Sequence, residues 1–409
     1  MDGAALEVPV VDPVIRDYLL LGLRLGRLVD GFVDCWFGDE RLWRQVQDEP
    51  TPEPARLARD ASRLRAALAG AELAEDRRRF LTAQARALEC SARRLAGTDI
   101  GFHAEVEAYF DVEIALTDTD RYAAGHDEIA ALLPGPGDLR ARLAAFHERD
   151  RIPAGRLGDA VRAVSGRLRA VARDRFLLPE RESVEYEVVG DRPWNAFNRY
   201  QGGFHSLVTL NADAGHGMSA LPHLATHEVY PGHHTEHCVK EAGLVRAGGQ
   251  AEQTIALVNT PQCLLAEGMA EVALHVALGA GWGPWTQGVL AEVGLRLDGE
   301  LVERLLPHTT TLLAARQDAA IMLHDRGADP EEVVAYLRRW MLVGEERARH
   351  MVRFLTDPLW RAYTVTYIEG SRLVRSWLAG AGDPAARYRR LLAEPLLPSQ
   401  LRAEAAAPT

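Results

Sequence analysis

The spacing of apolar residues predicts helices along most of the chain. Between residues 12 and 38 apolar side chains recur at helical intervals, and Asp12-Pro13 supplies a cap followed by a first-turn proline. Leu133-Pro-Gly-Pro-Gly137 marks a turn between helices. The same reasoning predicts further helices at about 53–68, 75–95, 101–118, 138–149, 154–176, 222–230, 261–278, 285–305, 308–326, 330–342, 345–354 and 358–379.

The pattern changes near the middle of the chain, where two short segments indicate strands. Val184–Val189 alternates apolar and polar residues, and Ser206–Asn211 follows a loop at 200–203. We therefore expect a mainly α fold with one small β-sheet directly before a histidine-rich segment. A helical lobe over 1–180 and a second lobe over 181–409 would form one continuous domain.

Composition excludes some classes of protein. A formal net charge of -11 disfavours a nucleic acid as the main partner, because phosphate binding needs clustered positive charge. The four cysteines form no CxxC pair, which favours reduced thiols in a cytoplasmic protein. The apolar run Leu19-Leu20-Leu21 is soon interrupted by Arg24, so we expect no membrane or export signal. The oligomeric state stays open.

The histidine-rich segment carries the chemistry. His227-Glu228 lies on an expected helix, and imidazole nitrogens beside a carboxylate are the groups that a zinc hydrolase needs for its ligands and its base. The usual zinc-binding spacing is i and i+4, but here the next histidine comes six residues later, about 120° away on an unbroken helix. Pro231-Gly232 can break that helix and redirect His233. His223 with His227, and His233 with His237, are rival i, i+4 pairs.

The run from His227 to His234 resembles the HExxPGHH signature of the DUF885 family, which is similar to helical zinc carboxypeptidases of the M32 type. That resemblance implies a zincin-like fold with His233 as the second metal ligand and His234 behind it or as an alternative ligand. Glu267-Gly268-Met269-Ala270 resembles the family's EGWA element and makes Glu267 the implied third ligand. The similarity extends from about residue 197 to the C-terminus.

Two further segments resemble the family, and three positions depart from it. Tyr367-Ile368-Glu369-Gly370 is similar to its Tyr-x-x-Gly element, and Arg316 with His324 falls in a segment similar to its arginine-rich helix. Met269 stands where the family has a tryptophan, Leu274 where it has a glutamate, and Ala320 where it has an acidic residue.

These residues predict a zinc-dependent hydrolase of peptide-like or small amide substrates. Zn²⁺ would be held by His227, His233 and Glu267, with Glu228 as general base. We expect the Tyr367 hydroxyl to stabilise an oxyanion, with His234 also at the catalytic centre. Arg316 is a candidate for holding a substrate carboxylate. The strand that ends at Asn211 could pair with an extended peptide, with Asn211 among the substrate contacts. Glu271 and His275, on the same helical face as Glu267, are expected behind the ligands.

Two other functions fit the same ligands. Two histidines and one carboxylate also describe non-haem Fe²⁺ sites, and another divalent metal could bind there. The departures at Met269, Leu274 and Ala320 allow a metal-binding protein without catalytic activity. Glu228 separates hydrolysis from iron chemistry, because an iron site has no need of an adjacent general base.

Overall fold

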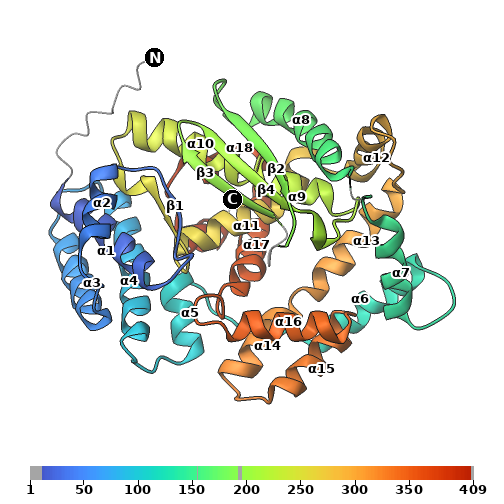
Figure 1. Cartoon of the computed structure of the whole chain (residues 1–409), viewed down its shortest axis with the longest axis horizontal. Coiled ribbons are helices and arrows are strands. Elements are labelled where there is room, and N and C mark those ends of the chain that lie inside the picture. Colours follow the sequence, from blue (N-terminus) through green and yellow to red (C-terminus); the bar gives the residue numbers. More distant parts are fainter. Residues whose placement is uncertain (1–11, 154, 192–195, 407–409) are drawn as a thin grey trace.

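The computed structural model describes residues 12–153, 155–191 and 196–406, and these residues form a mainly α fold with two small sheets (Figure 1). The α-helices are α1 Pro13–Leu28, α2 Glu40–Asp48, α3 Pro54–Ala69, α4 Glu75–Leu95, α5 Phe102–Phe110, α6 Thr119–Leu132, α7 Leu139–Asp150, α8 Leu157–Arg175, α9 Leu221–Glu228, α10 His233–Lys240, α11 Pro261–Leu278, α12 Trp282–Glu292, α13 Gly299–Leu312, α14 Ala315–His324, α15 Pro330–Trp340, α16 Glu345–Thr356, α17 Ser371–Ala379, α18 Pro384–Ala393 and α19 Pro398–Ala406. Shorter 3-10 turns (η1 Ala212–Ala214, η3 Ala251–Thr254) and π-turns (η2 Glu241–Ala247, η4 Thr366–Gly370) connect some of them.

Most expected helices are confirmed, and the differences arise where backbone turns interrupt a helical pattern. The Asp12 side chain accepts a hydrogen bond from the Val14 backbone and caps α1 as predicted. The expected helix to residue 38 is wrong, because α1 ends at Leu28 and Gly31 then adopts a positive φ. The expected helix at 285–305 is divided between α12 and α13, where Gly294 again has a positive φ and Asp298 caps a new helix.

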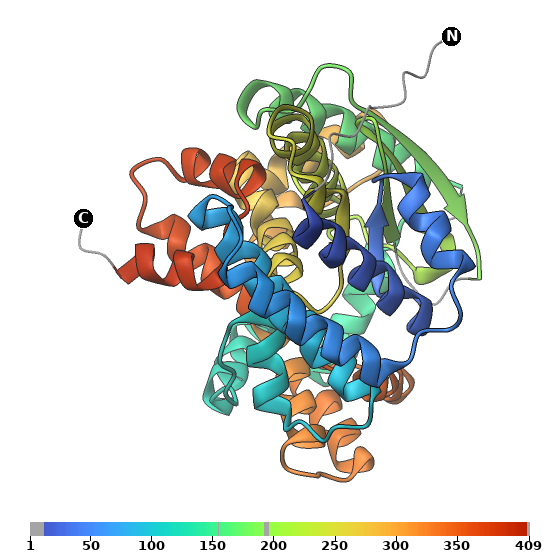
Figure 2. The same ribbon diagram turned by 90° about the vertical axis from the view of Figure 1, so that its left-hand side faces the viewer.

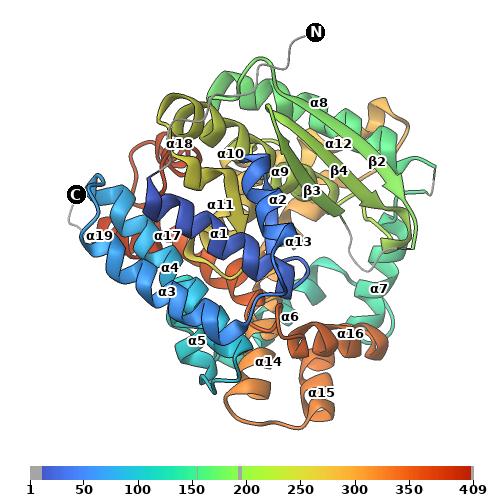
Figure 3. The same ribbon diagram turned by 60° about the vertical axis from the view of Figure 1, so that its left-hand side comes forward.

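A three-stranded sheet lies beside the histidine-rich segment, as expected, but with one strand more. Its strands are β2 Ser183–Val189, β3 Ala196–Gly202 and β4 His205–Asn211, in the order β2-β4-β3. β4 pairs in parallel with β2 and antiparallel with β3, and Figure 3 shows the strands side by side with α8 along them. The prediction that β4 offers an edge to a peptide is therefore wrong. β3, which was not expected and includes part of the expected loop at 200–203, is the edge strand that packs against α9 and α10.

A second, two-stranded ribbon joins distant parts of the chain. β1 Val33–Trp36 pairs antiparallel with β5 Ile255–Leu257, and their register shifts between Val33 and Cys35. The sequence pattern did not predict either strand. Their pairing fixes the segment after α1 against the segment that leads into α11.

The long helix α11 runs through the middle of the molecule, and the N-terminal helices α1, α3 and α4 cover one side of it (Figure 2). The larger of two apolar clusters contains residues from both expected lobes, such as Val164 and Leu221, so the described chain does not pack as separate units at residue 180. Among the described residues, no single helix has the length and apolar composition to cross a membrane. α11 and α12 together pass that test as a pair bent by 82°.

Candidate metal centre

The break between α9 and α10 brings two histidines together. α9 ends at Glu228, α10 begins at His233, and the Gly232 backbone N–H donates to the Thr226 carbonyl at 2.8 Å. An added Cβ at Gly232 would lie 2.0 Å from the His227 carbonyl oxygen, so this close approach admits only glycine. The result is an Nε2 to Nε2 distance of 3.2 Å between His227 and His233. The expected redirection by Pro231-Gly232 is confirmed in its geometry.

Helix α11 carries the third candidate ligand to the same point. The Glu267 carboxylate lies 3.3 Å from His227 Nε2 and 3.7 Å from His233 Nε2, and the side chain is buried. Four ligand atoms held at 2.0–2.1 Å around a tetrahedral zinc ion are separated by about 3.3 to 3.4 Å. The separation of the two imidazole nitrogens, 3.2 Å, is close to this value, and one Glu267 oxygen lies near each nitrogen, Oε2 near His227 and Oε1 near His233.

Two glycines allow α11 to approach the Tyr-x-x-Gly segment. A Cβ at Gly268 would lie 2.3 Å from the Gly370 carbonyl carbon, and a Cβ at Gly370 would lie 2.5 Å from the Leu264 oxygen. The backbones of α11 and η4 are therefore in direct contact. This contact brings Tyr363 to the ligands, where its hydroxyl donates to Glu267 Oε1 at 2.7 Å. The sequence analysis did not identify Tyr363 as a site residue, although it lies one helical turn before Tyr367.

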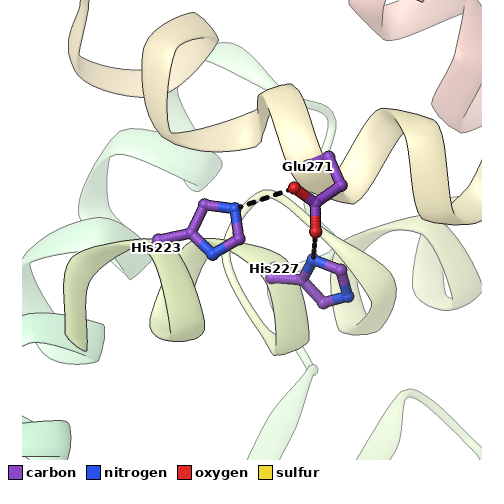
Figure 4. Close-up of side chains that lie close together, drawn as sticks. All are labelled: His223, His227 and Glu271. Atoms are coloured by element: carbon purple, nitrogen blue, oxygen red, sulfur yellow. Dashed lines mark ion pairs between the residues drawn. The ribbon is translucent and has the colours of Figure 1, made fainter. Parts of the chain in front are cut away.

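Each histidine also faces a carboxylate with its other ring nitrogen. His227 Nδ1 lies 3.5 Å from Glu271, which also lies 3.4 Å from His223 Nε2 (Figure 4). His233 Nδ1 lies 3.9 Å from Glu236. Carboxylates in this position orient metal-binding imidazoles and raise their basicity. The expected role of Glu271 behind the ligands is consistent with this arrangement.

The local charges favour a cation between the ligands. Burial lowers the pKa of His233, but Glu236, Glu267 and Glu228 outweigh this effect and raise the pKa to about 10. Burial lowers the pKa of His227, but the hydrogen bond to Glu267 and the charges of Glu267 and Glu228 together raise it. Burial raises the pKa of Glu267, yet the two histidines bring it below its usual value. Positive charge is therefore stabilised at this point, whether it is carried by protons or by a metal ion.

A cavity of about 150 Å³ opens beside the three ligands. Glu228 lines it, and the Glu228 backbone carbonyl accepts a hydrogen bond from Asn198 on β3. Tyr367 also lines it, with its ring 6.4 Å from the His227 ring. Glu228 and Tyr367 thus both line the cavity beside the three candidate ligands.

Three expected site residues lie elsewhere. Arg316 is not among the residues that line the cavity, and its guanidinium group lies over the ring of Tyr367, 5.7 Å from the ring centre. His234 is completely buried between Ser206 Oγ at 2.8 Å and Glu182 at 3.1 Å, and both ring nitrogens are engaged there. Asn211 is buried, and its side chain accepts from the Asp213 backbone at the start of η1.

The rival pairs and the family departures also have definite positions. His237 stacks on Tyr200 and belongs to no described three-residue ligand group, whereas His223 and His227 form such a group with Glu271. His275 lines a different hollow with Arg375. The three departures are buried side chains that do not line the cavity: Met269, Leu274 and Ala320.

Comparisons with known proteins show a similarity of fold alone. The chain matches no family model and no curated protein. Its structure is similar to one described as a "putative lipoprotein" from Colwellia psychrerythraea, with a TM-score of 0.53 and 16% identity over 85% of this chain. It is also similar to a "putative lipoprotein of unknown function" from Shewanella oneidensis, with a TM-score of 0.52 and 15% identity over 95% of this chain. The chain spans 65% and 72% of the lengths of these two proteins, and the likeness is one of fold.

Proposed function

We propose that the protein is a zinc-dependent amide hydrolase of the metallopeptidase type. The observation that carries this proposal is the arrangement of His227, His233 and Glu267, whose ligand atoms lie 3.2 to 3.7 Å apart beside a cavity that also contains Glu228. The outer nitrogens of both imidazoles face carboxylates, Glu271 at 3.5 Å and Glu236 at 3.9 Å, and carboxylates beside ligand histidines are a common feature of zinc sites.

The donor set fits zinc. Two imidazole nitrogens and one carboxylate are frequent ligands of catalytic zinc, and the buried Glu267 Oε2 atom faces His227 Nε2 at 3.3 Å. A bound zinc ion would supply a water of pKa near 7 and would polarise a carbonyl group. The second three-residue group shares His227 with the first, and its Glu271 is better explained as the partner of His227 Nδ1.

The chain's own residues would then handle protons and position the substrate. Glu228 would take a proton from the attacking water and return it to the leaving amine. The Tyr367 hydroxyl would donate a hydrogen bond to the developing oxyanion. The first residues of β3, Ala196–Asn198, line the cavity at a sheet edge, so an extended peptide could bind there as an added strand.

The test combines metal analysis with one conservative substitution. Protein purified without added metal should contain zinc near one equivalent, and Glu228→Gln should keep that zinc while hydrolysis of peptide amides falls at least about 100-fold. Asp39→Asn, which changes the same charge outside the cavity, is the matched control. Iron in place of zinc, with oxygen consumption that survives Glu228→Gln, would support the non-haem iron alternative. Bound zinc without hydrolysis of any amide would support the inactive alternative.

A further inference from the structure

Asp34 lies in the cavity because the β1–β5 ribbon contains a bulge. Val33 pairs with Leu257 and Cys35 pairs with Ala256, which leaves Asp34 as the extra residue between them. Bulges change the direction of a side chain and are frequent beside active sites. The Asp34 carboxylate lines the cavity and forms no hydrogen bond or ion pair with another described residue.

No cationic side chain forms an ion pair with Asp34 among the described residues, and His233, whose charge acts on Asp34, is itself flanked by Glu236 and Glu267. Lys240 is paired with Glu236, and burial lowers the pKa of His237 to about 3, so that this ring is neutral. A divalent ion would balance Glu267 and Glu228. Asp34 is the exposed residue of β1, so its carboxylate is accessible to a cationic group of a ligand in the cavity.

A second feature of the same cavity is an unpartnered amide. Gln253 is only 6% exposed, yet neither its Oε1 nor its Nε2 has a hydrogen-bond partner among the described residues. The Oδ1 atom of Asn198, on the β3 side of the cavity, is likewise buried without a partner. Buried polar atoms normally have partners, and these atoms are available to a ligand. Their oxygens are acceptors, as is the carboxylate of Asp34.

We propose that this cavity binds a protonated amine of the substrate, with Asp34 supplying the charge and the Gln253 and Asn198 side-chain oxygens supplying further acceptors. An ammonium group has three donors and no acceptor, so it matches such a set. Among the described residues that line the cavity, no unpaired cation is available for a substrate carboxylate. The substrates are therefore peptides or small amides that carry an ammonium group near the scissile bond. The identity of the cleaved bond depends on the proposed function. Recognition of the amine does not depend on it.

Two sources could supply the ammonium group: the α-amine of a peptide N-terminus or a lysine-like side chain. Three probes separate them by calorimetric titration into the full chain, with and without added zinc. L-leucinamide carries only the α-ammonium, Nα-acetyl-L-lysinamide carries only the side-chain ammonium, and N-acetyl-L-leucinamide is neutral. We expect one or both cationic probes to bind at least tenfold more tightly than the neutral probe, and the tighter one identifies the source.

Asp34→Asn should abolish most of this preference and leave binding of the neutral probe unchanged. Asp39→Asn is the matched control, because it makes the same change on the same segment at the cap of α2, where asparagine also serves as a cap. The proposal is overturned if the neutral probe binds as tightly as the cationic probes, if none binds, or if Asp34→Asn keeps the preference. Failure to bind zinc, measured separately, would refute the proposed function and leave recognition of the amine to be judged from the zinc-free titrations.

Discussion

The contact between α11 and η4 gives the sharpest test of how the fold builds the site. An alanine Cβ at position 268 would lie 2.3 Å from the Gly370 carbonyl carbon and 2.4 Å from its oxygen, whereas ordinary contacts begin at 3.4 Å. The two backbones would have to separate by about 1 Å in a closely packed interior. Glu267 directly precedes Gly268 and accepts a hydrogen bond from Tyr363. Separating the two backbones would therefore also displace Glu267, a proposed metal ligand.

The magnitude follows from two opposing effects. Replacing glycine with alanine inside a helix stabilises it by about 0.5 to 1 kcal/mol where space allows. Overpacking costs about 1 to 3 kcal/mol, and a clash with backbone atoms belongs at the upper end of that range, so Gly268→Ala should lower the free energy of unfolding by about 2 to 2.5 kcal/mol net. Gly166 lies within α8 with no atom within 4 Å of its added Cβ, and Gly166→Ala should raise stability instead. The same chemical change should therefore have opposite signs at the two positions.

Urea unfolding of both variants measures the stability difference, and titration with zinc against a competing chelator measures the metal site. We expect Gly268→Ala to bind zinc at least tenfold more weakly, with Gly166→Ala unchanged. The reasoning would be refuted if Gly268→Ala were as stable as Gly166→Ala and bound zinc as tightly as the wild type.

Three further predictions concern single side chains. Tyr363→Phe removes the donor to Glu267 and should weaken zinc binding by about 10- to 100-fold, measured by chelator competition; unchanged affinity would contradict the role of this hydroxyl. Glu271→Gln should weaken zinc binding to a similar extent in the same assay, whereas complete loss would instead indicate that Glu271 is a direct ligand. Burial raises the pKa of Glu182, but His234 and the other hydrogen-bond donors outweigh it and lower the pKa from 4.5 to about 2. The stability that this carboxylate contributes is thus present above pH 4.5 and is lost as the pH falls through about 2. Glu182→Gln should therefore lower the urea midpoint of unfolding at pH 7, and that midpoint should fall less between pH 5 and pH 2 than it does in the wild type. Parallel plots of urea midpoint against pH for the two proteins would contradict this.

The residues that could be predicted from sequence are those whose chemistry is local. His227, Glu228 and His233 stand within seven residues of one another, and the Pro-Gly interruption accounts for the otherwise unsuitable spacing. Glu267 was identified through the resemblance of Glu267-Gly268-Met269-Ala270 to the EGWA element. The start of α1 was predictable because Asp12 and Pro13 mark it, whereas its end at Leu28 was not.

The remaining features depend on pairings between distant segments. β1 and β5 are separated by more than two hundred residues, so nothing near Asp34 indicates the bulge that turns it into the cavity. His234 could not be distinguished from His233 by sequence, because only its packing against Ser206 and Glu182 removes it from the cavity. The sequence likewise suggested two separate glycine motifs, whereas the fold joins them in one backbone contact.

The central claim is that a single ion binds between α9, α10 and α11. Anomalous diffraction at the zinc absorption edge, from crystals of the full chain grown with zinc, tests it directly. We predict one strong peak at about 2.0 to 2.2 Å from His227 Nε2, His233 Nε2 and a Glu267 oxygen. A peak held instead by His223 and Glu271, or no peak among these residues, would contradict the account.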